Sequence, residues 1–142
     1  MGFGGAGAAD AQQAPGVCTQ LQVRVASIRS SLDRSTGRIR SQLQAMAGNE
    51  SGYAVESPAH LVVNLASGPV ARVSMPGALG GLTNGPYGAF YYDLGGKFDA
   101  GRFLSGAVAG QTVTFERSRE VRFAYRATPH GALYQERGPV LY

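Results

Sequence analysis

The first half of the chain carries apolar residues at helix-like spacing. Residues 17–47 contain no proline and one internal glycine, and the run stops at Gly48-Asn49, a typical helix C-terminal signal. When Cys18 is placed at position a of a heptad, most a and d positions are apolar. The pattern predicts a long helix over residues 17–48 that resembles a coiled coil, with a seam made by Leu21, Val25, Ile28, Leu32, Ile39 and Met46.

Such a helix can bury its seam in three ways. It can associate with copies of itself, pack on the chain's own sheet, or bind a foreign partner, and we favour self-association. The positions beside the seam carry Arg24, Arg29 and Arg38 but no acid, whereas a parallel homodimer usually pairs opposite charges there. We therefore expect these arginines to face an acidic partner, the second part of the chain, or nucleic acid.

From about residue 57 the period changes from helical to alternating. HLVVNL (60–65) and VARVSM (70–75) flank Ser67-Gly68-Pro69 and predict a hairpin. Further strands are predicted at GAFYYDL (88–94), QTVTFER (111–117), REVRFAYRA (119–127), ALYQER (132–137) and PVLY (139–142). The fold class is therefore α+β: a Gly/Ala arm (1–16), the long helix (17–48), and a small antiparallel β-sandwich or barrel with glycine-rich loops (57–142).

Glycine is the compositional anomaly of this chain of 142 residues. It occurs 21 times, and ten of these glycines lie between Gly77 and Gly110, so we expect this region to be rich in loops. The stretch GALGGLTNGPYGAFYY (77–92) also holds three tyrosines, a residue type favoured at protein interfaces. It predicts an interface loop that uses Tyr87, Tyr91 and Tyr92, with Tyr91 and Tyr92 on opposite faces of a strand.

The net charge of +4 comes almost entirely from arginine, because Lys97 is the one lysine. Five of the arginines lie in the predicted helix, against a single acid, Asp33. Arginine suits planar contacts to carboxylates and phosphates. The candidate contacts to phosphate or to an acidic partner are Arg24, Arg29, Arg34, Arg38 and Arg40.

No motif for catalysis, a metal or a cofactor is recognisable. GFGGAG (2–7) fits G-x-G-x-x-G, but no strand precedes it, and a proline interrupts the helix that should follow. Cys18 is the only thiol and is predicted to be a core residue, while His60 and His130 lie far from any ligand spacing. We expect a non-enzyme without cofactors. We also expect a cytoplasmic protein, because the chain lacks a signal peptide and a membrane-length apolar run.

The layout of arm, long helix, small β-domain and apolar C-terminus resembles the small structural proteins of tailed-phage virions, such as decoration, head-fibre, neck or tail components. The resemblance covers the whole chain loosely and rests on no motif, so it assigns no residue a role. It implies a homo-oligomer that docks onto a larger protein assembly, located in the virion. The alternative is a small nucleic-acid-associated protein whose arginine-rich helix contacts phosphates.

Overall fold

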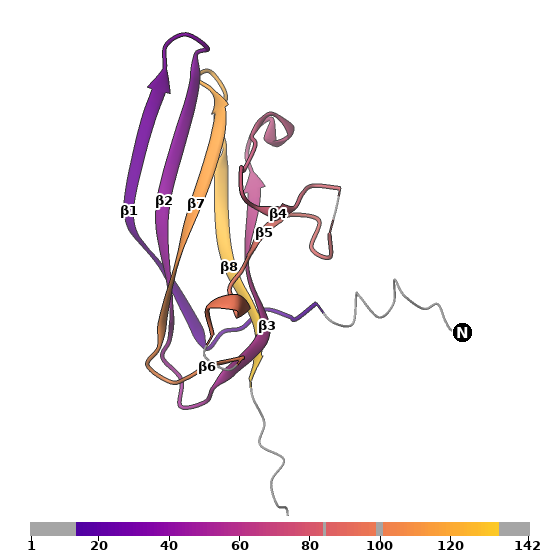
Figure 1. The fold of residues 1–142 in the computed structure, drawn as a ribbon. Helices are drawn as coiled ribbons and strands as arrows, with labels where there is room; N and C mark the ends of the chain where they lie inside the picture. Colours follow the sequence, from indigo (N-terminus) through magenta and orange to yellow (C-terminus); the bar gives the residue numbers. More distant parts are fainter. Residues whose placement is uncertain (1–13, 84, 99–100, 134–142) are drawn as a thin grey trace, which may run out of the picture.

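The computed structural model describes residues 14–83, 85–98 and 101–133. Within these ranges the chain is almost entirely β-structure, with two short 3-10 helices, η1 and η2 (Figure 1). The elements are β1 (Leu21–Asp33), β2 (Arg38–Asn49), β3 (Val55–Ala66), η1 (Val70–Arg72), β4 (Leu79–Gly80), β5 (Phe90–Asp93), η2 (Gly95–Lys97), β6 (Arg102–Phe103), β7 (Val108–Ser118) and β8 (Ala124–Leu133).

The strands form two antiparallel sheets that share one core. The first sheet has the order β1-β2-β7. In the second, β3 is central: β8 pairs with one of its edges, β5 and β6 pair with the other, and β4 lies beside β5. Leu43 and Val113 of the first sheet belong to the same buried cluster as Leu61 and Val63 of the second. The inner face of each sheet is the one that contributes to this cluster, and the outer face is turned away from it.

The predicted helix over residues 17–48 is wrong, because this segment forms the hairpin β1–β2. Its sequence also alternates with a period of two, which places Leu43, Ala45 and Ala47 together on the inner face. The hairpin turns after Asp33, whose Oδ1 accepts hydrogen bonds from the backbone N–H and the hydroxyl of Ser35. Gly37 closes the turn with a positive φ of 71°, a conformation that glycine adopts without strain.

A β-bulge explains why the heptad spacing misled the prediction. The register between β1 and β2 shifts between Val25 and Ser27. Val25 and Ile28 are three residues apart, so in a regular strand they would point to opposite faces. The extra residue in the bulge brings both onto the same face, which is also the face of Leu32. The coiled-coil seam in β1 is therefore one face of a bulged strand. No such shift occurs between β2 and β7, so Met46 lies on the outer face, opposite to that of Ile39.

The antiparallel β-structure of the second half is confirmed, but the predicted hairpin is wrong. VARVSM does not form the second strand of a hairpin, since it contains η1 and a single bridge from Ser74 to Glu116 of the first sheet. Residues 119–123 link β7 in the first sheet to β8 in the second, so these strands do not form a hairpin. The predicted strand at 139–142 and most of the arm lie outside the described residues.

A buried asparagine fixes one end of the sandwich. Asn49, the last residue of β2, is 1% exposed. Its Nδ2 donates hydrogen bonds to the carbonyl oxygens of Tyr53 (2.7 Å) and Phe103 (2.9 Å). Its Oδ1 accepts hydrogen bonds from the backbone N–H (3.0 Å) and hydroxyl (2.8 Å) of Ser51. The side chain thereby joins β2 to the turn before β3 and to β6.

We expect Asn49→Ala to lower the free energy of unfolding by about 2–4 kcal/mol, because it removes the donor that Asn49 supplies to the buried carbonyl of Phe103. Urea denaturation measures this change. Asn64→Ala is the matched control, since Asn64 is exposed on β3, and it should change stability by less than about 0.5 kcal/mol. Equal losses in the two variants would contradict the role given to Asn49.

Candidate functional site

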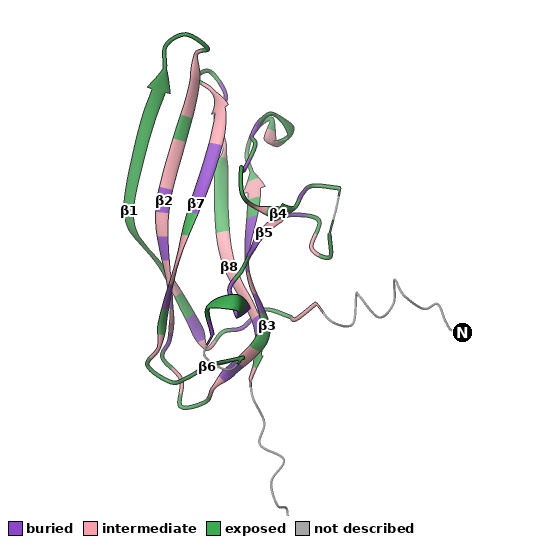
Figure 2. Ribbon diagram, viewed as in Figure 1, coloured by how far each residue is buried: buried purple, intermediate pink, exposed green. Residues whose placement is uncertain are grey.

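β1 exposes apolar side chains on its inner face. Leu21 at its start is buried, but Val25, Ile28 and Leu32 are 44%, 64% and 41% exposed. Figure 2 shows the strand exposed over most of its length, beside the more buried β2. Ile28 lies directly opposite Leu43 of β2, which is 4% exposed. The covered part of the core therefore ends between these two strands.

The opposite edge of the same sheet is partly covered. Ser74 exchanges two backbone hydrogen bonds with Glu116 of β7, at 2.8 and 2.9 Å. Next to this bridge, the backbone N–H of Thr114 donates to the hydroxyl of Tyr92 at 3.2 Å. β1, in contrast, pairs with β2 alone among the described residues. Alternate N–H and C=O groups along its other edge consequently have no strand partner in the part of the chain that the structure describes.

The edge of β8 is partly covered by the segment before β1. The backbone N–H of Cys18 donates to the carbonyl of Pro129 (2.9 Å), and that of Gly131 donates to Gly16 (3.0 Å). Cys18 is 2% exposed, so its predicted place in the core is confirmed.

The predicted seam is divided by the structure. Leu21 is part of the core, and Val25, Ile28 and Leu32 form the exposed apolar row on β1. Ile39 is half-buried opposite Leu32. The sixth predicted residue, Met46, lies on the outer face opposite Arg24.

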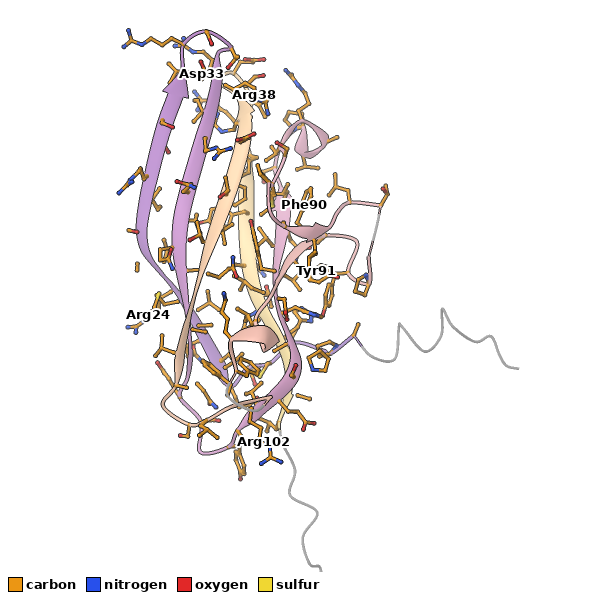
Figure 3. The ribbon with its side chains drawn as sticks, in the orientation of Figure 1. Arg24, Asp33, Arg38, Phe90, Tyr91 and Arg102 are labelled. Carbon is orange, nitrogen blue, oxygen red and sulfur yellow. The ribbon has the colours of Figure 1, made fainter. Side chains whose placement is uncertain are left out.

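The five candidate arginines stay on the hairpin but do not form one cluster. Arg24 and Arg38 lie near its two ends (Figure 3). On the outer face, Arg40 donates from Nε to Glu116 at 2.7 Å and forms an ion pair with that carboxylate. Arg29 is exposed on the same face, and Arg34 lies in the turn. Four of these arginines therefore share the outer face but are spread along the length of the hairpin.

The three predicted tyrosines have separate roles. Tyr91 and Tyr92 do point to opposite faces, since Tyr92 is buried in the core cluster while Tyr91 packs on the outer face of the second sheet. Tyr87 contacts Tyr91 there, with ring centroids 5.3 Å apart. Tyr87 and Tyr91 both also contact the ring of His60. The two tyrosines therefore pack within the protein, in an aromatic cluster with His60.

Strand register brings two histidines into this cluster. His60 of β3 is paired with His130 of β8, and the ring of Tyr87 lies 5.6 and 4.8 Å from theirs. The sequence does not predict that these histidines are neighbours, because nothing local indicates that β3 pairs with β8. His130 Nδ1 lies 2.9 Å from the carbonyl oxygen of Pro15. A carbonyl only accepts, so this nitrogen carries the hydrogen.

Burial sets the protonation of the Tyr87–His60 pair. Burial, with a smaller effect from Tyr91, raises the pKa of Tyr87 to about 12. Its hydroxyl is therefore protonated at neutral pH, and it forms a hydrogen bond with His60 Nδ1, 2.6 Å away. Burial also lowers the pKa of His60; the charge of Asp93 opposes this effect and His130 adds to it. The pair is thus neutral in the folded state at neutral pH.

Two further findings concern chemistry and membranes. Among the described residues, no group of three or more His, Cys, Asp or Glu side chains is placed to hold a metal ion. No helix in that part of the chain is both long and apolar enough to cross a membrane.

We expect the stability of the protein to fall as the pH drops below 6.5. The folded state binds a proton at His60 less readily than the unfolded state does, so the stabilisation is present above the unfolded pKa and is lost as the pH falls towards the folded one. Urea denaturation at pH 7.5 and 5.5 measures the loss. The His60→Gln variant, which cannot titrate there, should lose less; an equal loss in both proteins would contradict this origin.

Comparison with protein family models, with curated proteins and with solved structures finds no match for this chain. The function is therefore argued from the molecule itself. Two of its features await an explanation: the exposed apolar edge strand β1, and the arginines around the turn that follows it.

Proposed function

We propose that the chain is a structural protein that self-associates by pairing β1 with β1 of a second copy. The observation that carries this proposal is the exposure of Ile28 in an open edge strand of thirteen residues. A long edge strand with apolar side chains is prone to pair with another strand, and proteins usually protect such edges. Ser74 and Tyr92 cover part of the β7 edge, whereas the outer edge of β1 has no strand partner among residues 14–83, 85–98 and 101–133.

A second copy is the occupant that the charges and spacing of β1 favour. The regular part of the strand runs from Ser27, after the bulge, to Asp33, before the turn. Its midpoint is Ser30. An antiparallel pair with its two-fold axis at Ser30 aligns this entire part with its own copy, and it keeps the inner faces of both sheets on the same side.

This register also matches the side chains. On the inner face, Ile28 lies opposite Leu32 of the second copy, twice across the axis. On the outer face, Arg29 lies diagonal to Asp33 of the second copy. The two Arg29 side chains are also diagonal to each other, and the two Asp33 carboxylates offset this repulsion. An axis at Arg29 would place like charges directly opposite, and an axis at Ile28 would take Asp33 out of reach.

The proposed function does not include the virion location that the layout of the sequence suggested. The resemblance to virion proteins included a long helix, and the structure has a hairpin in its place. We therefore propose a homo-oligomeric structural protein. Docking onto a larger assembly stays a prediction, as does the absence of enzymatic activity.

We expect the protein to be a dimer in solution and Ile28→Lys to be a monomer, because the substitution places a charge in each apolar cluster of the pair. Light scattering after gel filtration measures the mass, against 14.8 kDa for one chain. The control is Leu104→Lys, which changes another exposed apolar residue, 55% exposed and outside β1, and should remain a dimer. A monomeric wild-type protein, or loss of the dimer in both variants, would overturn the proposal.

The register has its own test. Residues directly opposite in an antiparallel pair have Cα atoms about 4.5–5.5 Å apart, a separation that a disulfide can span. Ser30→Cys should therefore form an interchain disulfide on mild oxidation, seen as a dimer on a non-reducing gel. Ser31→Cys should not, because Arg29 of the second copy lies opposite it. Cross-linking through residue 31 but not 30 would show dimerisation in a different register.

A further inference from the structure

Arginines gather at the end of the sandwich where β1 turns into β2. This arginine end consists of the turn 34–37, the neighbouring Arg38, and the link 119–123 between β7 and β8. The backbone N–H of Arg119 donates to the carbonyl of Gly37 at 3.1 Å, which joins the link to the turn. Arg34 and Arg119 thereby line one open depression with Gly37 and Leu32.

The acids at this end are already occupied. Glu116 pairs with Arg40, and Glu120 pairs with Arg72 at 2.9 Å. The pKa of Glu120 is lowered by a hydrogen bond from its own backbone and by that from Arg72, with a smaller effect of the charge of Arg119. The carboxylate of Asp33 accepts hydrogen bonds from Ser35. Serine is neutral, so Asp33 keeps its charge and is the one acid of this end, among the described residues, that forms no ion pair.

Four arginines of this end keep their guanidinium groups available. Their side chains form no hydrogen bond or ion pair with another described residue. These arginines are Arg34, Arg38, Arg119 and Arg122. Arg38 is half-buried and the other three are exposed. Against them stands Asp33 alone, so the arginine end has a surplus of positive charge.

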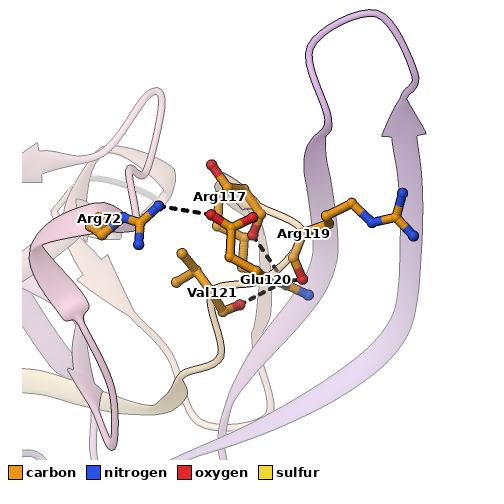
Figure 4. Close-up of polar contacts among 6 residues, drawn as sticks. Arg72, Arg117, Arg119, Glu120 and Val121 are labelled. Carbon is orange, nitrogen blue, oxygen red and sulfur yellow. Dashed lines mark hydrogen bonds and ion pairs between the residues drawn. The ribbon is translucent and has the colours of Figure 1, made fainter.

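The link that presents two of these arginines is held in place from inside. Arg117 donates from Nη1 to the carbonyl of Val121 at 2.7 Å and lies over the ring of Phe123. The Arg72–Glu120 pair holds the link from the other side, while the Arg119 side chain extends toward the β1–β2 hairpin (Figure 4). The backbone that carries Arg119 and Arg122 is therefore held by these contacts before any partner binds, which lowers the entropy cost of ordering the link.

We infer that the arginine end binds the phosphate backbone of a nucleic acid, independently of self-association. Guanidinium groups bind phosphate oxygens through paired hydrogen bonds. Cations supplied by two chain segments around one depression suit a partner that carries charge at regular intervals along its length. Phosphate contacts carry no sequence information, so the binding is independent of base sequence.

The test uses the full chain and a fluorescein-labelled single-stranded oligonucleotide, with anisotropy measured over a range of salt concentrations. Arg34→Ser/Arg119→Ser should weaken binding about tenfold or more and reduce the slope of log K against log salt by roughly 1.4, the value for two lost phosphate contacts. Arg24→Ser/Lys97→Ser removes the same charge from exposed positions away from the arginine end. This control should weaken binding less than about threefold.

Three results would overturn the inference: no binding by the wild-type chain at low salt, equal losses in the two double variants, or tighter binding of polyglutamate than of the oligonucleotide. The last result would identify an acidic protein as the partner. Urea midpoints of the variants separate a loss of contacts from a loss of fold. The salt slope of the wild-type chain also tests the inference without any substitution.

Discussion

The need of every strand edge for hydrogen-bond partners organises this structure. β3 satisfies both of its edges with other strands, which makes it the centre of the second sheet. β7 covers part of its outer edge with an irregular segment and a tyrosine hydroxyl. β8 uses residues 16–18 for part of its edge. β1 is the longest strand, and its outer edge has no strand partner within the described chain. The same strand exposes a row of apolar side chains, so it lacks partners both for its backbone and for its apolar face.

The sequence predicted the second half of the fold better than the first for a physical reason. In β7, Val113 and Phe115 alternate with polar residues, and this period of two indicates a strand. In β1 the bulge shifts the alternation by one residue, which turns it into the four-three-four spacing of a coiled coil. Asp33 and Gly37 carried the competing signal, since together they form a turn in the middle of the predicted helix. A helix prediction had to treat both as tolerated exceptions.

Local sequence patterns also identified only some of the candidate residues. The apolar row Val25, Ile28 and Leu32 was identified from sequence because its members share a face in either structure. The histidine–tyrosine cluster was not, since it depends on the pairing of strands about seventy residues apart in sequence. The arginine end needed long-range information too: Arg34 and Arg38 were on the sequence-derived list, whereas Arg119 and Arg122 join them only because β7 returns beside β2.

The open edge of β1 and part of the arginine end lie on the same hairpin, and their geometry links them. In a pair with its axis at Ser30 the two β1 strands run in opposite directions, so the two arginine ends lie at opposite ends of the shared sheet. A dimer of this kind presents two separated phosphate-binding ends to one long polyanion. Once the first end is bound, the second binds as an intramolecular step at a raised effective concentration. Self-association through apolar contacts would in this way strengthen the electrostatic binding of the polyanion to the arginine ends. β1 contributes little charge of its own to that binding.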